Sequence, residues 1–383
     1  MTYGQGPPPG PPNPPGPPPL GRPYDGLGKD ALDHFKVGQA AFLAEDDVRG
    51  GLGPVFTEKS CVACHAGPAI GGSGNRLVTR IGRITAGQFD PMIEFGGPLI
   101  QDRGIGRFNG VKFEGEVVPR EARIVARRRT VPLFGLGLVD AVPDDTFVAI
   151  ALQEQQFSPL TAGRPSLVAD PITGQPRVGK FGWKAQQSSL FAFAGDAYQN
   201  EMGVTTPTFP SENCPQGNCN LLAANPAKLK PNDADDGTVH QLADFMTLLA
   251  PPPLPRIGPV ENAGQVLFGK IGCADCHRPI LQAGPSPIAP LNHAPFAPYS
   301  DFLLHDMGSL GDGIVQNQAG PREMRTAPLW GIRFERTFLH DGRAPSIEAA
   351  IIAHDGQGRG ARDRYMALTK AQRDQFLAFL NAL

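Results

Sequence analysis

Two short motifs contain the residue types most able to do chemistry. Each has the pattern Cys-x-x-Cys-His, and together they use four of the 6 cysteines of the chain. Two thiols at this spacing reach the two vinyl groups on one edge of a porphyrin, and the adjacent imidazole can bind the iron. A lone copy could equally be a redox or metal-binding cysteine pair, but two copies favour c-type haem attachment. The predicted attachment residues are Cys61, Cys64 and His65 in the first copy and Cys273, Cys276 and His277 in the second.

The ligand on the opposite face of each iron decides whether a haem only transfers electrons. Two strong axial ligands give an electron-transfer haem, whereas a five-coordinate iron can bind peroxide or dioxygen. The chain has 8 histidines, and two of them, His65 and His277, already belong to the motifs. The remaining candidates for axial ligation are His34, His240, His293, His305, His340 and His354.

Composition restricts the class of protein. The chain has 383 residues, with 35 basic against 37 acidic side chains, and this balance argues against nucleic-acid binding. No apolar run approaches the length of about 18 residues that spans a bilayer, so no transmembrane segment is predicted. Cys214 and Cys219 flank a short loop and could form a disulfide, with two free thiols as the alternative. Because c-type haem is attached outside the cytoplasm, we expect a periplasmic or otherwise exported protein whose export signal is absent from this numbering.

Pro and Gly content shapes the predicted organisation. The 41 prolines and 47 glycines predict many turns and long loops. Residues 1–27 are interpreted as a Pro/Gly-rich flexible tail, 28–250 as an N-terminal cytochrome c-like domain, 251–259 as a linker, and 260–383 as a C-terminal cytochrome c-like domain. The predicted fold class is mainly α with long loops, with one c-type haem in each of the two domains.

Apolar spacing predicts the helices that position the motifs. A helix precedes each motif and other helices follow it, which is a weak internal repeat. Between residues 67 and 115 the sequence is Gly-rich and is interpreted as a haem-covering loop with one hairpin. The expected helices span residues 32–43, 146–155, 189 onward, 239–249, 261–269 and 370–383.

The C-terminal part resembles the bacterial di-haem cytochrome c peroxidases. The resemblance lies in Arg325-Thr326-Ala327-Pro328-Leu329-Trp330, in Phe338-Leu339-His340-Asp341-Gly342-Arg343, and in Ser346-Ile347-Glu348-Ala349-Ala350. In that superfamily the sixth ligand of the C-terminal haem lies fourteen residues after the histidine that His340 matches, and fourteen residues after His340 comes His354. The resemblance therefore implies a bis-histidine haem 2 with His277 and His354, and His340 as a nearby structural residue. Met307 and Met324 are alternative ligands.

The N-terminal half shows the same resemblance. Arg128-Arg129-Thr130-Val131-Pro132-Leu133-Phe134 and Phe181-Gly182-Trp183-Lys184 are similar to segments of those peroxidases, which implies that Trp183 relays electrons between the haems. Asn200-Glu201-Met202-Gly203 implies that Glu201 is an acid/base over the open face of haem 1. An ordinary core tryptophan and a solvated glutamate are the alternatives. Phe193 stands where the family has a glutamine, which predicts a distal pocket less polar than that of a typical peroxidase.

Haem 1 is expected to be open on one face. No histidine lies between His65 and His240, so a distal histidine is missing, although Met92 is a candidate ligand. The match over most of residues 30–383 is most specific to a sister group, the di-haem oxidoreductases, through segments such as Leu303-Leu304-His305-Asp306-Met307-Gly308. In this interpretation His305 is structural or contacts a haem propionate.

This resemblance implies an enzyme that reduces hydrogen peroxide at haem 1 with electrons relayed from haem 2. A small cytochrome or cupredoxin would be the electron donor, and one Ca²⁺ between the domains is an open expectation, because related peroxidases bind one. The alternatives are oxidation of a partner protein, as in methylamine-dehydrogenase maturation enzymes, dioxygen activation, as in rubber oxygenases, and non-catalytic electron transfer.

Overall fold

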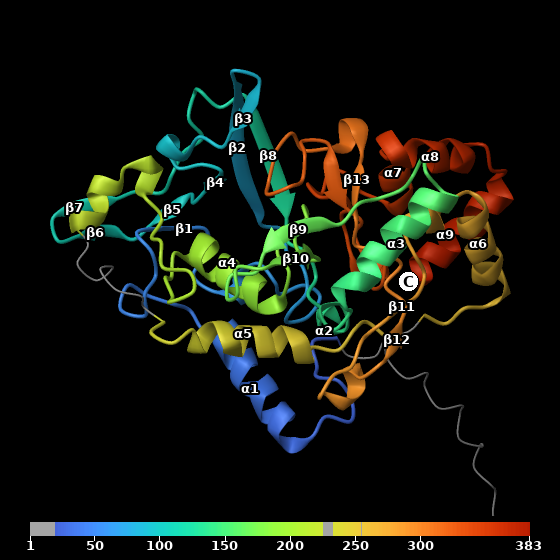
Figure 1. Cartoon of the computed structure of the whole chain (residues 1–383), viewed down its shortest axis with the longest axis horizontal. Coiled ribbons are helices and arrows are strands. Elements are labelled where there is room, and N and C mark those ends of the chain that lie inside the picture. The colour runs from blue at the N-terminus through green and yellow to red at the C-terminus, as the bar shows by residue number, and fades with distance from the viewer. Residues whose placement is uncertain (1–19, 225–232, 254) are drawn as a thin grey trace, which may run out of the picture.

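Part of the N-terminal Pro/Gly-rich tract packs against the core of the protein. The computed structural model describes residues 20–224, 233–253 and 255–383, and the predicted flexible segment 1–19 lies outside them (Figure 1). Residues 20–27 differ from the expectation, because Leu20, Tyr24 and Leu27 pack against the main core. The Tyr24 amide also donates to the Leu248 carbonyl at 3.2 Å. Burial of these three apolar side chains stabilises residues 20–27 against the core, so the predicted boundary of the flexible tail at residue 27 was wrong.

Helices α1 (Lys29–Leu43) and α5 (Gly237–Leu248) cross closely in the N-terminal half. Gly38 lies at the crossing, where an added Cβ would be 2.2 Å from the Gln241 carbonyl oxygen. Phe35 and Phe245 pack beside it with ring centroids 5.3 Å apart. A glycine that weakens a helix in isolation is therefore required here by the close approach of two backbones.

Helices α6 (Pro259–Lys270) and α9 (Lys370–Ala382) repeat this arrangement in the C-terminal half. A Cβ on Gly264 would lie 2.1 Å from the Gln375 carbonyl oxygen. Four residues after each glycine comes a phenylalanine beside the motif histidine: Phe42 lies 5.9 Å from His65 and Phe268 lies 6.4 Å from His277, between ring centroids. The predicted internal repeat thus includes the helix crossing as well as the motif.

The segment expected to be loop contains a sheet. Strand β2 (Leu77–Thr85) pairs antiparallel with β8 (Ile124–Arg129), with Leu77 opposite Arg129. Strands β3 (Gln88–Asp90) and β4 (Leu99–Ile100) complete the four-stranded sheet, which projects at the upper edge of the molecule in Figure 1. The expected fold class, mainly α, therefore holds only in part. The two-stranded pairs are β1 (Val55–Phe56) with β5 (Arg103–Gly104), β6 (Gly106–Phe108) with β7 (Val111–Phe113), β9 (Ser166–Ala169) with β10 (Pro176–Gly179), β11 (Leu281–Gln282) with β12 (Pro295–Phe296), and β13 (Leu304–Asp306) with β14 (Glu323–Arg325).

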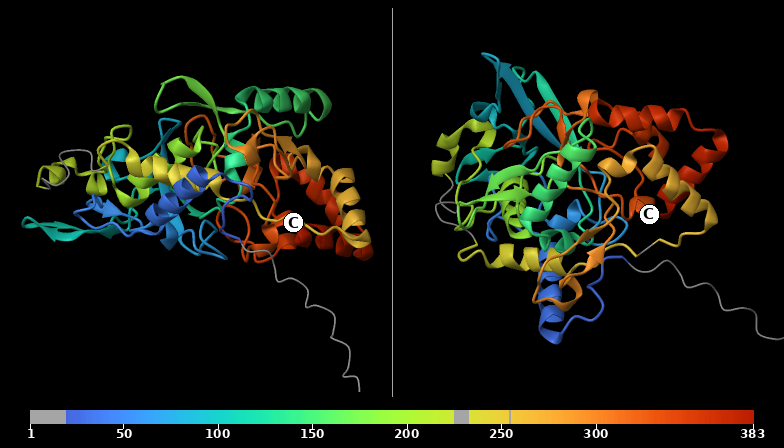
Figure 2. Two further views of the ribbon diagram at one scale, coloured as in Figure 1. Left: turned by 90° about the horizontal axis from the view of Figure 1, so that it is seen from below. Right: turned by 45° about the vertical axis from the view of Figure 1, so that its right-hand side comes forward.

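The main core contains residues from both sides of the predicted linker. Leu281, Leu291, Phe296 and Phe302 belong to the same buried cluster as the N-terminal helices. A second cluster holds the C-terminal helices together through Phe268, among others. In Figure 2 these helices gather at one end of the molecule. One buried core therefore spans the predicted linker, and the division of the chain into two domains stays a prediction. The helices not yet given are α2 (Leu136–Asp140), α3 (Asp144–Phe157), α4 (Leu190–Met202), α7 (Ile347–Ile352) and α8 (Arg359–Met366).

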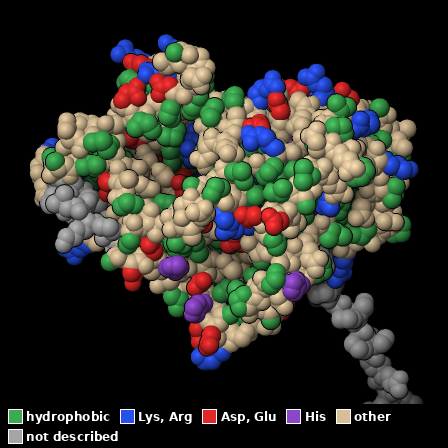
Figure 3. Space-filling view, viewed as in Figure 1, with side chains coloured by type: hydrophobic (Ala, Val, Ile, Leu, Met, Phe, Trp, Pro, Cys, Tyr) green, Lys and Arg blue, Asp and Glu red, His purple; other side chains and the backbone are tan. Residues whose placement is uncertain are grey.

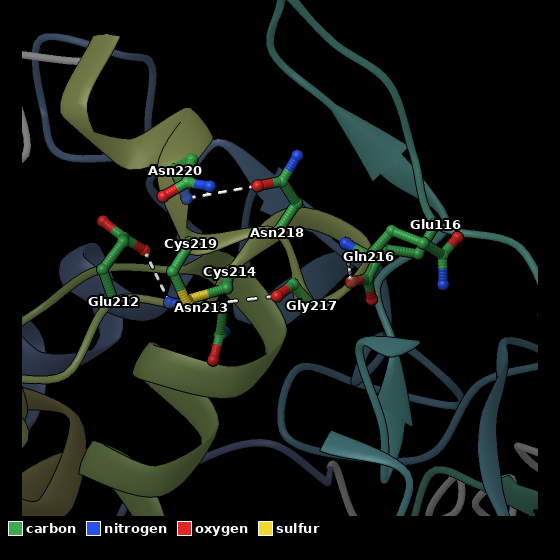
Figure 4. Close-up of a disulfide and its surroundings, with 9 residues drawn as sticks. All are labelled: Glu116, Glu212, Asn213, Cys214, Gln216, Gly217, Asn218, Cys219 and Asn220. Atoms are coloured by element: carbon green, nitrogen blue, oxygen red, sulfur yellow. Dashed lines mark hydrogen bonds between the residues drawn. A yellow bond between two sulfur atoms is a disulfide. The ribbon is translucent and has the colours of Figure 1, made fainter. Parts of the chain in front are cut away.

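The predicted disulfide is present in the structure. Cys214 and Cys219 form a disulfide, which confirms the predicted pairing, and Gln216 within the loop donates its amide to Glu116 (Figure 4). Positive and negative side chains are interspersed on the face shown in Figure 3. Across the described ranges, no helix combines the length and apolar character that crossing a membrane requires.

Candidate active site

The first motif is placed by a short turn against a cavity. A 3-10 turn (Cys61–Ala63) lets the His65 amide donate to the Cys61 carbonyl at 3.1 Å, so both thiols and the imidazole line one cavity. His65 Nδ1 lies 2.9 Å from the Gly72 carbonyl oxygen. That oxygen can only accept a hydrogen bond, so Nδ1 carries the proton and Nε2 is left with a free lone pair.

The second motif is built in the same way around a second cavity. The turn (Cys273–Asp275) brings the His277 amide to the Cys273 carbonyl at 2.9 Å, and His277 Nδ1 lies 3.0 Å from the Tyr299 carbonyl. The residues lining this cavity include Cys273, Cys276 and His277. The imidazole of His277 therefore also presents Nε2 as the ligand atom.

The structure places His354 opposite His277. The centroids of the two imidazoles are 6.4 Å apart, and His354 Nδ1 lies 2.8 Å from the Ala350 carbonyl oxygen at the end of α7. Metal–imidazole bonds of about 2 Å, with each ring nitrogen about 1 Å from its centroid, require about 6 Å between two imidazoles that share one metal ion. The spacing therefore fits one iron held between His277 and His354. Met307 and Met324 line the same cavity.

Burial keeps the ligand candidates in their metal-binding forms. Desolvation lowers the pKa of His65 and of His277 to about 4, so both imidazoles are neutral at physiological pH. Burial also lowers the pKa of His354. The same effect raises the pKa of Cys61 and of Cys273 to about 12, which suppresses thiolate chemistry. Neutral imidazoles with oriented Nε2 atoms, each beside two unionised thiols, fit c-type haem better than a redox cysteine pair.

The two cavities share one wall, and Trp183 belongs to it. Its indole Nε1 donates to the Arg129 carbonyl at 2.9 Å, and its ring meets the His340 ring edge-on with centroids 6.2 Å apart. Segments 129–131 and 182–183 come from β8 and from the turn after β10, and they reach this wall from different parts of the chain. The residues that line both cavities are Arg129, Thr130, Val131, Gly182, Trp183 and Phe193.

Glu201 lines the first cavity, which contains only one of the ligand histidines. It lies near the C-terminus of α4, and its carbonyl accepts a hydrogen bond from the Thr57 amide at 2.6 Å. Burial raises the pKa of Glu201, while Arg80 and Arg76 oppose the shift. A carboxyl group that retains its proton to higher pH in a cavity is suited to proton transfer.

Polar side chains from three elements line the first cavity. Asp196, Arg80 and Arg128 line it together with Glu201, while the expectation that Phe193 makes this pocket less polar than a typical peroxidase pocket stays a prediction. Phe193 belongs to the wall between the cavities. Asp196 comes from α4, whereas Arg80 and Arg128 come from β2 and β8, and this convergence depends on the sheet that the sequence did not reveal.

The other candidate ligands lie in different environments. Met92 is buried against Ile81 and Ile100, outside the described residues that line the first cavity, so its candidacy as a ligand is not supported. His340 and His305 line the second cavity, and His305 Nε2 pairs with Asp301 at 2.9 Å. Among the described residues, neither cavity lining includes His34, His240 or His293.

A compact group near the second motif was not foreseen. Cys276 Sγ lies 3.5 Å from His305 Nδ1, and Asp301 completes a set whose spacing could hold a metal ion. This set offers one sulfur and one nitrogen atom beside one carboxylate, whereas Ca²⁺ prefers six to eight oxygen ligands. It therefore does not meet the expectation of calcium, which stays a prediction.

The comparison with protein families identifies the family of this chain. Residues 109–383 match the model of the family described as "Di-haem oxidoreductase, putative peroxidase". Among the curated proteins, none matches the chain. Solved structures with a similar chain include hydrazine synthase from Kuenenia stuttgartiensis, at 16% identity and TM-score 0.42, covering 94% of this chain and 90% of that one. A MauG-like protein associated with microbial copper homeostasis matches at 16% identity and TM-score 0.40, over 96% and 92%. A variant of the diheme peroxidase BthA from Burkholderia thailandensis matches at 15% identity and TM-score 0.43, over 94% and 86%.

Proposed function

Because the chain belongs to the di-haem oxidoreductase family, we propose that it reduces hydrogen peroxide with electrons from a small cytochrome or cupredoxin. The observation that supports this proposal is the inequality of the two cavities. The second has two facing imidazoles, His277 and His354, whereas the first has one imidazole, His65, and the carboxyl group of Glu201. When bound, each haem supplies an iron that exchanges single electrons, and an iron with a free axial face also offers a site for peroxide.

The side chains of this protein would handle protons and position. The net reaction, H2O2 + 2 H⁺ + 2 e⁻ → 2 H2O, requires a proton on the departing oxygen when the O–O bond breaks. Glu201 is the group we assign to accept a proton from one peroxide oxygen and return it to the other. Trp183 lies in the wall common to both cavities and is the aromatic side chain we assign to the electron path between them.

Attachment and location belong to the same proposal. Cys61 and Cys64 would hold haem 1, and Cys273 and Cys276 would hold haem 2, through thioether bonds. The disulfide between Cys214 and Cys219 supports an oxidising compartment such as the periplasm.

Phe193 favours a second candidate function, the activation of dioxygen. It places an apolar ring on the wall of both cavities, which suits dioxygen activation on an apolar substrate. The polar side chains of Arg80 and Asp196 in the first cavity favour peroxide instead.

Stopped-flow spectroscopy of the holoprotein with peroxide tests the proposal. The oxidised protein is expected to show a high-spin ferric signal beside a low-spin bis-histidine signal, and the half-reduced protein should turn peroxide over. Two low-spin haems would refute an open first site. A fast reaction of the fully oxidised protein, without turnover after half-reduction, would favour oxidation of a partner protein.

A further inference from the structure

Lys184, the residue after Trp183, is completely buried and is surrounded by oxygen atoms. None of its side chain is exposed to solvent. Its Nζ lies 3.0 Å from the Gly320 carbonyl oxygen, 2.7 Å from the Glu323 carbonyl oxygen and 3.0 Å from Asp312 Oδ1. All three acceptors come from the C-terminal half of the chain, so this ammonium group crosses the boundary between the two halves.

The number of acceptors indicates the charge on this side chain. An ammonium group has three N–H donors and can serve all three acceptors, whereas a neutral amine has two and can serve only two of them. Asp312 also accepts a hydrogen bond from Arg128 Nε at 2.8 Å, so one carboxylate serves two cations. Burial lowers the pKa of Lys184 and Asp312 opposes this shift, while both cations lower the pKa of Asp312.

The neighbouring backbone is attached to the same C-terminal strand. The Arg325 amide donates to the Trp183 carbonyl at 2.9 Å, and Arg325 Nε donates to the Gly182 carbonyl at 2.7 Å. Residues 182–184 are thus fixed to β14 and the preceding loop by two backbone acceptors and by one buried charge. The Trp183 indole, on the opposite side, is fixed to β8 through Arg129.

We propose that Lys184 is a positioning residue, an internal cation that holds Trp183 in the wall between the two haem cavities. The ammonium group neutralises Asp312 and the carbonyl dipoles of Gly320 and Glu323, and it thereby fixes the segment that carries the indole. The consequence for electron exchange rests on the proposed function of Trp183 as the path between the haems.

The chain provides a matched control four residues earlier. Lys180 is also completely buried, and its Nζ contacts two carbonyl oxygens, of Asp140 at 3.2 Å and Val142 at 3.0 Å, and Asp144 Oδ1 at 3.3 Å. It therefore has the same kind of partners as Lys184, but all of them lie within the N-terminal half. Loss of Lys180 removes a comparable buried charge without detaching residues 182–184 from the C-terminal half.

The first test is hydrogen–deuterium exchange of the holoprotein, which does not depend on turnover. In Lys184→Met, the amide of Arg325 should exchange about tenfold faster or more, because loss of a hydrogen bond to a charged group shifts a local equilibrium by about one to two decades. In Lys180→Met, exchange at Arg325 should stay at the wild-type rate. Equal exchange at Arg325 in the two variants would overturn the proposal. If Lys184→Met yields no holoprotein, Lys184→Gln replaces it, because the amide keeps two donors and loses only the charge.

The second test is the rate of electron exchange between the haems in half-reduced protein. Lys184→Met should slow this rate about tenfold or more, since small displacements of a positioned group carry large rate penalties, while both haem spectra stay unchanged. An unchanged rate, together with slow exchange at Arg325, would refute the role of Lys184. Trp183→Phe separates the two ideas: if that variant exchanges electrons normally, the relay is wrong, and the hydrogen-exchange result still decides whether Lys184 holds the segment.

Discussion

Replacement of Glu201 by Gln tests the proton-transfer role most directly. Glutamine keeps the size of the side chain and its place in the first cavity, but it cannot accept and return a proton. General acid–base catalysis contributes about 10²- to 10⁴-fold, which corresponds to about 3–5 kcal/mol of activation free energy. We therefore expect the second-order rate constant with peroxide to fall by that factor, measured by stopped-flow absorbance under single-turnover conditions.

The direction in which the rate of the same reaction changes with pH also tests the role of Glu201. Glu201 must be ionised to accept the first proton, so the wild-type rate should rise with pH through the pKa of this group. Burial raises that pKa above its ordinary value of 4.5, and the inflection should therefore lie above pH 4.5 and be absent in Glu201→Gln.

Glu116 is a suitable control for Glu201. It is a buried carboxyl group whose pKa is raised to about 7, and it is connected to the same region because its carboxylate accepts from the Gln101 amide. Gln101 in turn donates its side-chain amide to the Asn200 carbonyl at 3.1 Å. Glu116 does not, however, line the first cavity, so Glu116→Gln should react with peroxide at the wild-type rate. A Glu201→Gln variant within threefold of the wild type, or an equal loss in both variants, would refute the assignment.

Three further predictions follow from the ligands, the helix crossing and the buried carboxyl group. His354→Ala should convert the low-spin signal of haem 2 to high-spin in absorption and electron paramagnetic resonance spectra, and an unchanged signal would transfer the ligand role to Met307 or Met324. Gly264→Ala should cost about 1–3 kcal/mol in urea unfolding because its Cβ meets the Gln375 carbonyl at 2.1 Å, whereas Gly269→Ala, with open space around it, should not destabilise the protein. Glu116 binds its proton more tightly in the folded state, so its contribution to the free energy of unfolding is complete below about pH 4.5 and is lost as pH rises through about 7. The loss is about 3 kcal/mol at most, and Glu116→Gln should remove this pH dependence from the unfolding curves.

Local patterns predicted the parts of the site that are encoded locally. The two motifs fix which thiols and imidazoles lie together, and helical spacing predicted α1, α5, α6 and α9 to within a few residues. His354 was predicted from its spacing of fourteen residues after His340, and the structure places it opposite His277. These features depend on residues a few positions apart, or on a segment whose pattern is itself specific.

Features that depend on distant pairing were not predicted. Strand β2 contains Arg80, Arg83 and Gly82, so it lacks the alternating apolar pattern that reveals a strand. Its pairing with β8 nevertheless brings Arg80 and Arg128 to the first cavity, and no local pattern predicted this convergence. The contact of Lys184 with Asp312 joins residues more than a hundred positions apart and has no local signature.

Gly38 shows a different limit of sequence reasoning. Within one helix a glycine lowers helix propensity, so Gly38 by itself is unfavourable in the helix that apolar spacing predicts over residues 32–43. Its advantage becomes visible only when α5 is placed across it, with the Gln241 carbonyl oxygen 2.2 Å from the position that a Cβ would occupy. Propensity concerns one segment, whereas close packing concerns two, and in this helix packing outweighs propensity.

One buried core spans the predicted linker, so side chains from the two halves of the chain cover one another. A cut within residues 251–259 would leave Leu281, Leu291, Phe296 and Phe302 without the N-terminal side chains that cover them. At roughly 1.5–3 kcal/mol for each large apolar side chain, the uncovered surface would favour aggregation over an isolated half.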